Sequence, residues 1–234
     1  MTSKLSSLSI VIPALNEVEA LPPLLEQLAG ARERGAEVIV VDGGSEDDTV
    51  ALARACGVRV IEAPRGRATQ LQAGIDASAG EVLWLLHADS DIDPLSDQHI
   101  LWGLAESGRP WGWFSLRLSG RHPLLRVVAR MINVRSRLSG IATGDQGIFG
   151  MRWALERIGG VPQQALMEDV ELSVRLRRIG PPLVLLKRIT SSSRHWERRG
   201  VLRTILLMWR LRLAYAMGAS TEVLAERYRA ASGR

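Results

Sequence analysis

The sequence predicts an α/β fold in which a mostly parallel sheet is covered by helices on both faces. Short apolar runs rich in β-branched residues alternate with amphipathic stretches over residues 1–90. A glycine follows each of these helical stretches, where a left-handed residue is least costly. No internal repeat or linker interrupts the 234 residues. We therefore expect a single domain, 1–234, made of two functional halves (about 1–118 and about 119–234).

The first half supplies the regular alternation. Four apolar runs are expected as strands: Leu8–Ala14, Glu37–Asp42, Val58–Glu62 and Glu81–His87. Helical spacing predicts three helices between them: Glu19–Arg34, Asp47–Cys56 and Ala68–Ala79. Gly35, Gly57 and Gly80 are expected to end these helices in the left-handed conformation.

The second half is less regular and richer in helix. Two strands are expected before and after its central helices, Trp111–Leu118 and Leu183–Lys187, with a short strand at Gln146–Gly150. Apolar spacing predicts helices at Pro123–Leu138, Asp169–Ile179 and Val201–Met217.

Charge is distributed unevenly along the chain. Residues 1–118 hold 9 Lys/Arg against 17 Asp/Glu, whereas residues 119–234 hold 21 against 8. A basic half is typical of a surface that faces nucleic acid, phospholipid headgroups or a phosphorylated substrate, although a solvated arginine-rich surface gives the same composition. No nucleic-acid reading motif accompanies the basic half, so we expect no nucleic-acid partner.

Three features that the sequence lacks indicate the compartment: an internal disulfide, a signal peptide and a membrane-spanning segment. The single cysteine, Cys56, excludes an internal disulfide and fits a reducing compartment. The first residues lack the charged start and apolar stretch of a signal peptide, and no segment approaches the roughly 20 apolar residues that span a bilayer. We expect a cytoplasmic protein, soluble or peripheral at the inner face of the cell membrane, with a homodimer left open.

Polar residues follow three of the predicted strands. Asn16-Glu17 follows the first strand, Asp42-Gly43-Gly44-Ser45 the second, and His87-Ala88-Asp89-Ser90-Asp91 the fourth. Each cluster alone is explained by a helix cap or a turn. Because ligands of open parallel sheets bind at the carboxyl ends of the strands, the coincidence of three clusters predicts one binding crevice.

The third cluster is the most acidic. Asp89, Asp91 and Asp93 follow a fully apolar strand, and hard oxygen ligands on a short loop suit Mg²⁺ or Mn²⁺. A divalent metal at this point neutralises a leaving diphosphate. The alternative is a solvated acidic loop in front of a helix that starts at Pro94.

Two further segments carry chemistry. Arg67, in Arg65-Gly66-Arg67, has the forked guanidinium that pairs with phosphate, although a surface ion pair explains it equally well. Glu168 and Asp169 open a predicted helix, where carboxylates are favoured by the helix dipole. A carboxylate in that place is either a simple capping residue or a base that accepts a proton from an attacking hydroxyl.

The combined motifs resemble inverting family 2 glycosyltransferases of the GT-A fold, which have a Rossmann-like, mostly parallel sheet flanked by helices. The resemblance spans roughly residues 8 to 200 and rests on SIVIPALNE, EVIVVDGGSEDDT, GRATQLQAGIDASAGEVLWLLHADSDI, GDQGIFGMR and GGVPQQALMEDVELSVRLRRIG. The wording of HAD, GDQGIF and MEDVELSVRLRR is similar to the radical-SAM/selenodomain-associated transferase 2 subgroup.

The resemblance implies a UDP- or GDP-sugar donor whose nucleoside contacts match Pro13, Glu17 and Asp42, and we add Gly44 and Arg67 as donor-binding candidates on their chemistry. It also implies a Mn²⁺ or Mg²⁺ ion at Asp89, which matches the last acid of the family's metal motif, with His87 in place of the first acid; Asp91, from the acidic loop, is a second candidate ligand. His195 matches a further metal ligand of some relatives.

The same resemblance implies roles for the second half. Asp169 matches the catalytic base and Glu168 its neighbour. Asp145 and Gln146 match a loop near the sugar and the acceptor. The implied reaction is a single displacement that transfers the sugar to an acceptor hydroxyl, with inversion.

The helix at Val201–Met217 bears on the acceptor. Arg199, Arg203 and Arg210 fall on one side of this apolar helix. A basic amphipathic helix of this kind lies in a membrane interface or packs on its own domain or a second subunit. We therefore expect an acceptor of unknown identity that is lipid-linked or amphiphilic.

Two other classes compete with the transferase. A nucleotidyltransferase would carry a glycine-rich phosphate loop after the first strand, where this sequence reads PALNEVEALP. A nucleotide- or membrane-binding module without catalysis is favoured by His87 and opposed by Glu168-Asp169.

Overall fold

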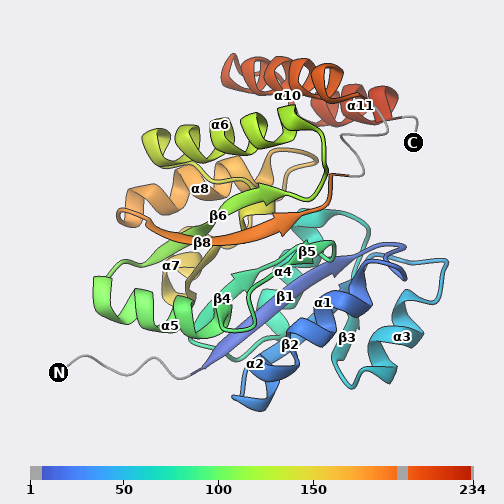
Figure 1. Cartoon of the computed structure of the whole chain (residues 1–234), viewed down its shortest axis with the longest axis vertical. Helices are drawn as coiled ribbons and strands as arrows, with labels where there is room; N and C mark the ends of the chain where they lie inside the picture. Colours follow the sequence, from blue (N-terminus) through green and yellow to red (C-terminus); the bar gives the residue numbers. More distant parts are fainter. Residues whose placement is uncertain (1–6, 194–199, 233–234) are drawn as a thin grey trace.

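The computed structural model describes residues 7–193 and 200–232. In these residues eight strands form one sheet with the order β3-β2-β1-β4-β7-β6-β8-β5 (Figure 1). The strands are β1 (Leu8–Ala14), β2 (Glu37–Asp42), β3 (Arg59–Glu62), β4 (Val82–Leu85), β5 (Ser90–Asp91), β6 (Trp111–Leu118), β7 (Phe149–Met151) and β8 (Leu183–Ser191).

The sheet is mostly parallel, as the sequence predicts. β3, β2, β1 and β4 are parallel neighbours. β7 runs antiparallel to both β4 and β6, so β6 and its parallel neighbour β8 share the direction of the first four strands. The short β5 pairs antiparallel with β8. The carboxyl ends of β1, β2 and β4 therefore lie at one rim of the sheet.

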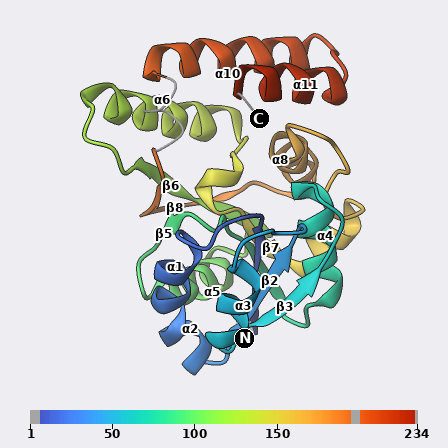
Figure 2. The same ribbon diagram turned by 90° about the vertical axis from the view of Figure 1, so that its right-hand side faces the viewer.

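Helices cover both faces of the sheet (Figures 1 and 2). One core joins alternate residues of β1 to α1 (Leu21–Gln27), α2 (Ala29–Glu33), α3 (Thr49–Ala55) and α5 (Ser96–Ser107). The core on the other face involves α4 (Arg67–Ala77), α7 (Arg152–Arg157) and α8 (Glu168–Ile179). Burial on both faces explains why these strands are nearly continuous in apolar character.

The remaining helices lie at one end of the molecule. α6 (Pro123–Ser139) packs on the end of β6 and against α10 (Val201–Ala216). α10 and α11 (Thr221–Ser232) pack on the start of α8. In the part of the chain that is described, no helix is long and apolar enough to cross a membrane.

Several predicted elements are corrected by the structure. The helix expected at Glu19–Arg34 is two helices that meet at Leu28. The strand expected at Gln146–Gly150 is a 3₁₀ turn, η1 (Gly144–Gln146), followed by β7, because Gly147 adopts a left-handed φ of 57° and turns the chain. β5, α7 and α11 were not predicted from the sequence. The strand expected at Leu183–Lys187 is longer, since β8 extends to Ser191.

The glycine prediction is correct at two of three positions. Gly35 and Gly57 adopt φ values of 94° and 68°. Gly80 is not among the residues with positive φ. It is required for a different reason, since a Cβ there would lie 2.6 Å from the backbone nitrogen of Ser9. Glycine at this position lets the chain before β4 approach β1.

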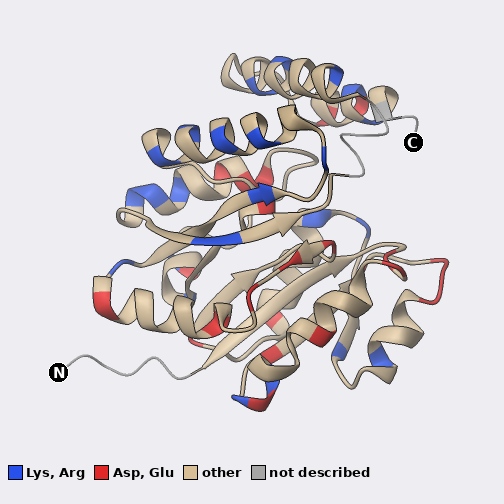
Figure 3. Ribbon diagram, viewed as in Figure 1, with Lys and Arg blue, Asp and Glu red and all other residues tan. Residues whose placement is uncertain are grey.

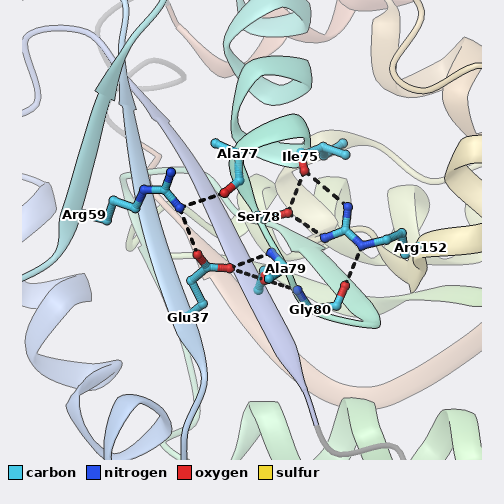
Figure 4. Close-up of polar contacts among 9 residues, drawn as sticks. Glu37, Arg59, Ile75, Ala77, Ser78, Ala79, Gly80 and Arg152 are labelled. Carbon is cyan, nitrogen blue, oxygen red and sulfur yellow. Dashed lines mark hydrogen bonds and ion pairs between the residues drawn. The ribbon is translucent and has the colours of Figure 1, made fainter.

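The rim opposite the strand carboxyl ends is held by three charged side chains, Glu37, Arg59 and Arg152 (Figure 4). Glu37 accepts hydrogen bonds from the Ser9 hydroxyl (2.6 Å) and from the Ala79 backbone (3.0 Å), and it pairs with Arg59 at 3.2 Å. Arg152, at the start of α7, donates to the carbonyl oxygen of Gly80 (2.8 Å). These contacts join segments from both halves of the chain.

Charge separates in space as it does in the sequence (Figure 3). Asp and Glu gather on the part of the molecule built from β1–β4 and their helices, and Lys and Arg on α6, α8 and α10. The two halves of the chain thus form adjoining acidic and basic regions.

Candidate functional site

The loops after β1 and β2 are tied together at the strand carboxyl ends. The backbone nitrogen of Asn16 donates to the Ser45 hydroxyl (2.9 Å), and the side-chain oxygen of Asn16 accepts from the Glu46 nitrogen (2.8 Å). The buried amide of Gln70, from α4, donates to the carbonyl oxygens of Ala14 and Val41. The strand ends therefore form one rim, as the sequence predicts.

Asp42 shapes the loop at this rim. Its carboxylate is 3% exposed and accepts from the backbone nitrogens of Gly44 (2.9 Å) and Ser45 (3.0 Å) and from the Ser45 hydroxyl. Glu17 is held next to it, since its backbone nitrogen donates to Thr49 Oγ1 at 2.8 Å. Pro13 pairs with Val41 in the adjacent strands. The residues predicted to contact the nucleoside thus lie together.

A second group of charges lies where α8 begins. Arg67, at the start of α4, donates to Oε1 of Glu168 (3.4 Å). Burial raises the pKa of Glu168, as does the charge of Asp169, while Arg67 opposes both. The Arg67 side chain is 49% exposed. Its partial burial lowers its pKa, but the charges of Glu168, Asp169 and Asp89 raise it by more, so Asp89, from the loop after β4, is within electrostatic range of this group.

Asp169 is oriented by backbone groups. Its Oδ2 accepts from the nitrogen of Gly144 (2.7 Å), and its Oδ1 accepts from the nitrogen of Val170 (2.7 Å). The preceding residue, Met167, adopts a left-handed φ of 66°, which is uncommon for a residue other than glycine and costs about 1–3 kcal/mol. Such strain is maintained by the surrounding packing, here the contacts of Met167 with the C-terminal helices.

His87 packs against the same loop. A Cβ on Gly144 would lie 2.6 Å from Nε2 of His87, so glycine is needed for this approach. Burial lowers the pKa of His87 well below its usual value, and the nearby charge of Arg67 lowers it further. His87 is therefore neutral near pH 7.

These side chains line a small pocket. Its volume is about 20 Å³, enough for roughly one water molecule. The polar lining is Arg67, His87, Gly144, Glu168 and Asp169. The rest of the wall is apolar, with residues such as Leu71, Leu85 and Leu172. The pocket brings the predicted base, its acidic neighbour and a phosphate-binding arginine into contact with one space.

Residues 9–109 match the sequence model of glycosyl transferase family 2. The match spans 101 of the 234 residues, so it shows that this part of the chain is similar to the family. The match covers the acidic half that supplies the strand-end clusters.

Two curated relatives are similar to this chain. Undecaprenyl-phosphate 4-deoxy-4-formamido-L-arabinose transferase of Sodalis glossinidius is 30% identical over 165 residues, which cover 62% of this chain and 48% of the relative. Dodecaprenyl-phosphate galacturonate synthase of Rhizobium johnstonii is 35% identical over 98 residues, 37% of this chain and 29% of the relative. The chain spans about half of the first relative's length and less of the second. Neither match bears on the radical-SAM-associated subgroup, which stays a prediction.

The fold of this chain is similar to that of a solved structure. Glucosyl-3-phosphoglycerate synthase from Mycobacterium tuberculosis, in complex with Mn²⁺ and UDP-glucose, superimposes with a TM-score of 0.61 over 79% of this chain and 70% of that chain. Sequence identity is 20%, so the likeness concerns the fold alone. It agrees with the predicted GT-A architecture.

The other residues predicted as metal ligands lie in different surroundings. Asp91, exposed on β5, accepts from the side chain of Gln27 at 2.8 Å. Asp93 accepts from the Leu95 nitrogen and lies 3.9 Å from Lys187. His195 lies outside the described residues. Within residues 7–193 and 200–232, no group of three or more His, Cys, Asp or Glu could hold a metal ion.

The loop of η1 completes the site. Gln146 is fully buried, and its Oε1 accepts from Ser136 (2.8 Å) and from the Thr143 nitrogen (3.1 Å), so it supports the loop from beneath. Asp145 has a buried Oδ1 without a hydrogen-bond partner among the described residues. Burial raises the pKa of Asp145, and the charge of Asp169 raises it further.

Two contributors were not singled out from the sequence. Arg135, on α6, has a buried Nε without a partner among the described residues. Burial lowers its pKa, whereas the charges of Asp145 and Asp169 raise it, so Arg135 lies within electrostatic range of both acids. An arginine inside an apolar helical pattern is the one signal the sequence offered. Tyr228, on α11, packs against the cluster at the start of α8 from a helix that was not predicted from the sequence.

Proposed function

We propose that this chain is an inverting glycosyltransferase that moves a sugar from a nucleoside diphosphate sugar to an acceptor hydroxyl. One observation carries the proposal. Asp169 and Glu168, at the start of α8, lie in the same charged group as Arg67 and Asp89 from the sheet rim. A base, a phosphate-binding cation and an acidic loop are the parts that such a transfer requires. The match of residues 9–109 to the model of glycosyl transferase family 2 supports the same reaction class.

The donor occupies the acidic half in this proposal. Pro13, Glu17, Asp42 and Gly44 form the nucleoside end of the site, and Arg67 pairs with the diphosphate through its guanidinium. UDP and GDP are both candidates for the nucleotide. The neighbour complexed with UDP-glucose supports a uridine nucleotide. The halves at about 1–118 and 119–234 then bind donor and acceptor respectively.

The described carboxylates fit a Mn²⁺ or Mg²⁺ ion bound together with the donor. Such ions are held by one or two carboxylates, waters and substrate phosphates rather than by a complete set of protein ligands. Asp89 is the first candidate ligand, because its charge acts on Arg67 in the pocket. Asp91 and His195 are the others. A bound ion would supply charge neutralisation for the leaving diphosphate. The neighbour's complex with Mn²⁺ supports its use.

The chemical step follows from the residues at α8. Asp169 accepts the proton of the acceptor hydroxyl as that oxygen attacks the anomeric carbon, and the bond to the diphosphate breaks on the opposite face. The Gly144 nitrogen holds Asp169 Oδ2 in a fixed direction, so little reorganisation is needed. Arg67 stays paired with the departing phosphate. Asp145 and Gln146 support the side of the site that faces the acceptor.

The acceptor is proposed to be lipid-linked or amphiphilic. Both curated relatives are named for polyprenyl-phosphate acceptors. The basic half of this chain is complementary to an anionic acceptor (Figure 3). A site for such an acceptor is consistent with a cytoplasmic protein that is peripheral at the inner face of the cell membrane.

Binding and turnover measured on the same protein test the proposal. Calorimetric titration with UDP, GDP, ADP and CDP, with and without Mn²⁺, is expected to show one preferred nucleotide whose affinity rises at least tenfold with the metal. Hydrolysis of the matching nucleotide sugars is expected as slow release of free sugar. Binding without any hydrolysis or transfer would instead favour a module that has lost catalysis.

A further inference from the structure

Two helices of the basic half expose the same apolar pattern. On α6, Val127, Met131, Val134 and Leu138 are 47–84% exposed. On α10, Leu202, Leu206, Trp209 and Leu213 are 58–64% exposed. Both sets follow the spacing i, i+4, i+7, i+11, which at about 100° per residue keeps each within about 60° of the helix circumference. We name them the α6 stripe and the α10 stripe.

Neither stripe takes part in the core. α6 buries Leu125, Val128 and Ala129, and α10 buries Val201, Thr204 and Leu211, on the opposite sides of the helices. A helix on the surface of a globular protein normally has one apolar face. A second apolar face, directed outward, marks a contact with another surface.

Arginines border both stripes. The sequences of α6 and α10 contain seven arginines and no acidic residue. Arg203 and Arg210 lie on one side of the α10 stripe and Arg212 on the other, each about 70–90° from its centre. Arg126 and Arg130 border the α6 stripe on one side, about 70–110° from its centre. An apolar strip between rows of cations is the arrangement of helices that lie in an anionic membrane interface.

The two stripes belong to one end of the molecule. α6 and α10 pack together through Leu125, Val128, Val201 and their neighbours, and they lie beyond the sheet (Figures 1 and 2). An open groove of about 850 Å³ runs along the α6 stripe to Arg135. Ser136, next to Arg135 on α6, donates to Oε1 of Gln146 in the η1 loop (2.8 Å), so this end of the molecule borders the acceptor side of the proposed site.

We infer that the α6 and α10 stripes together dock the protein on an anionic lipid bilayer. The apolar residues enter the boundary of headgroups and acyl chains, and the arginines pair with lipid phosphates. A second copy of this chain fits less well, since a symmetric contact would bring seven arginines against seven. The inference rests on the proposed function, in which the acceptor is lipid-linked or amphiphilic. Docking on a bilayer places the donor site next to such an acceptor.

Vesicle flotation in the absence of any donor sugar tests the inference separately from catalysis. The full chain is mixed with vesicles of phosphatidylcholine alone or with about one third phosphatidylglycerol. Trp209→Gln combined with Leu138→Gln removes the largest side chain of the α10 stripe and the most exposed side chain of the α6 stripe. Trp102→Gln combined with Leu186→Gln is the matched control, since these side chains are 68% and 74% exposed on α5 and β8.

We expect binding to the anionic vesicles that weakens as salt rises, and little binding to phosphatidylcholine. The stripe variant is expected to bind at least tenfold more weakly, while the control variant binds like the wild type. Equal loss in both variants, or no binding to anionic vesicles by the wild type, would overturn the inference. A concentration-dependent dimer that the stripe variant alone abolishes, without vesicle binding, would assign the surface to a second copy instead.

Discussion

The Oδ2 atom of Asp169 lies 2.7 Å from the backbone nitrogen of Gly144, and the place where Gly144 would carry a Cβ lies 2.6 Å from Nε2 of His87. The η1 turn is therefore held between the start of α8 and the end of β4. Gly144 therefore connects the proposed base, Asp169, to His87 and so to the acidic loop at the sheet rim.

Gly144→Ala is expected to reduce transfer at least tenfold without unfolding the protein, because the new methyl group must displace the His87 ring. The backbone conformation of Gly144 is one that alanine tolerates, since its φ is not positive. A double-mutant cycle with His87→Ala checks the cause. The second substitution makes room for the methyl group, so the two losses should not add. Full additivity would contradict a steric origin.

Asp169→Asn is expected to lower turnover at least 100-fold and to leave nucleotide affinity within about twofold, since the loss concerns proton acceptance. Glu171→Gln is the matched control. It changes an acid in the same helical turn that contacts Arg175 and Tyr215 rather than the pocket. Turnover and donor binding are measured for both variants. Normal turnover by Asp169→Asn would show that the base lies elsewhere.

Arg67→Ala is expected to weaken donor binding about 10- to 100-fold, in line with the loss of a charge-assisted hydrogen bond to phosphate. Arg65→Ala, two residues away and exposed, should bind the donor like the wild type. Titration with the preferred nucleoside diphosphate compares the two. Similar losses for both arginines would point to a general effect of positive charge rather than to a specific contact.

Asp89→Asn is expected to remove most of the gain in nucleotide affinity that Mn²⁺ produces. Asp91→Asn should remove less, because the Asp91 carboxylate already accepts from Gln27. Asp93→Asn, beside Lys187, serves as the control and should behave like the wild type. The measurement is nucleotide affinity at several Mn²⁺ concentrations. Undiminished Mn²⁺ dependence in Asp89→Asn would remove this residue from the metal site.

The thermal stability of the protein is expected to depend on pH through Glu37. Burial raises the pKa of Glu37, but hydrogen bonds from Ser9 and Ala79 and the ion pair with Arg59 outweigh it, so the pKa is lowered. Its contribution is then fully present above the unfolded-state pKa and is lost as pH falls through the folded-state value. We expect the Tm difference between wild type and Glu37→Gln to be largest near pH 7 and to shrink towards pH 3. A constant difference would contradict this account.

The local sequence pattern was sufficient to predict most strands of the sheet. β1, β2 and β6 have the predicted bounds because nearly continuous apolar runs, β-branched in β1 and β2 and aromatic in β6, favour a strand that is buried on both faces. The Glu168-Asp169 pair was found because acids at a helix start are a local signal. α11 was not predicted, since its few apolar residues gain their meaning only when Leu224 and Tyr228 pack against Met167 and α10.

By itself, the sequence determined the α/β class, the polar strand ends and the separation of charge, because each depends on residues close together in the chain. Only the tertiary structure decided that Arg67 reaches Glu168 across 101 positions and that Gly144 binds Asp169 across 25. The tertiary structure also decided that Arg135 lies within electrostatic range of Asp145 and Asp169, and that the α6 and α10 stripes remain exposed. These relationships follow from how elements pack on one another, and packing depends on all the side chains of the core at once.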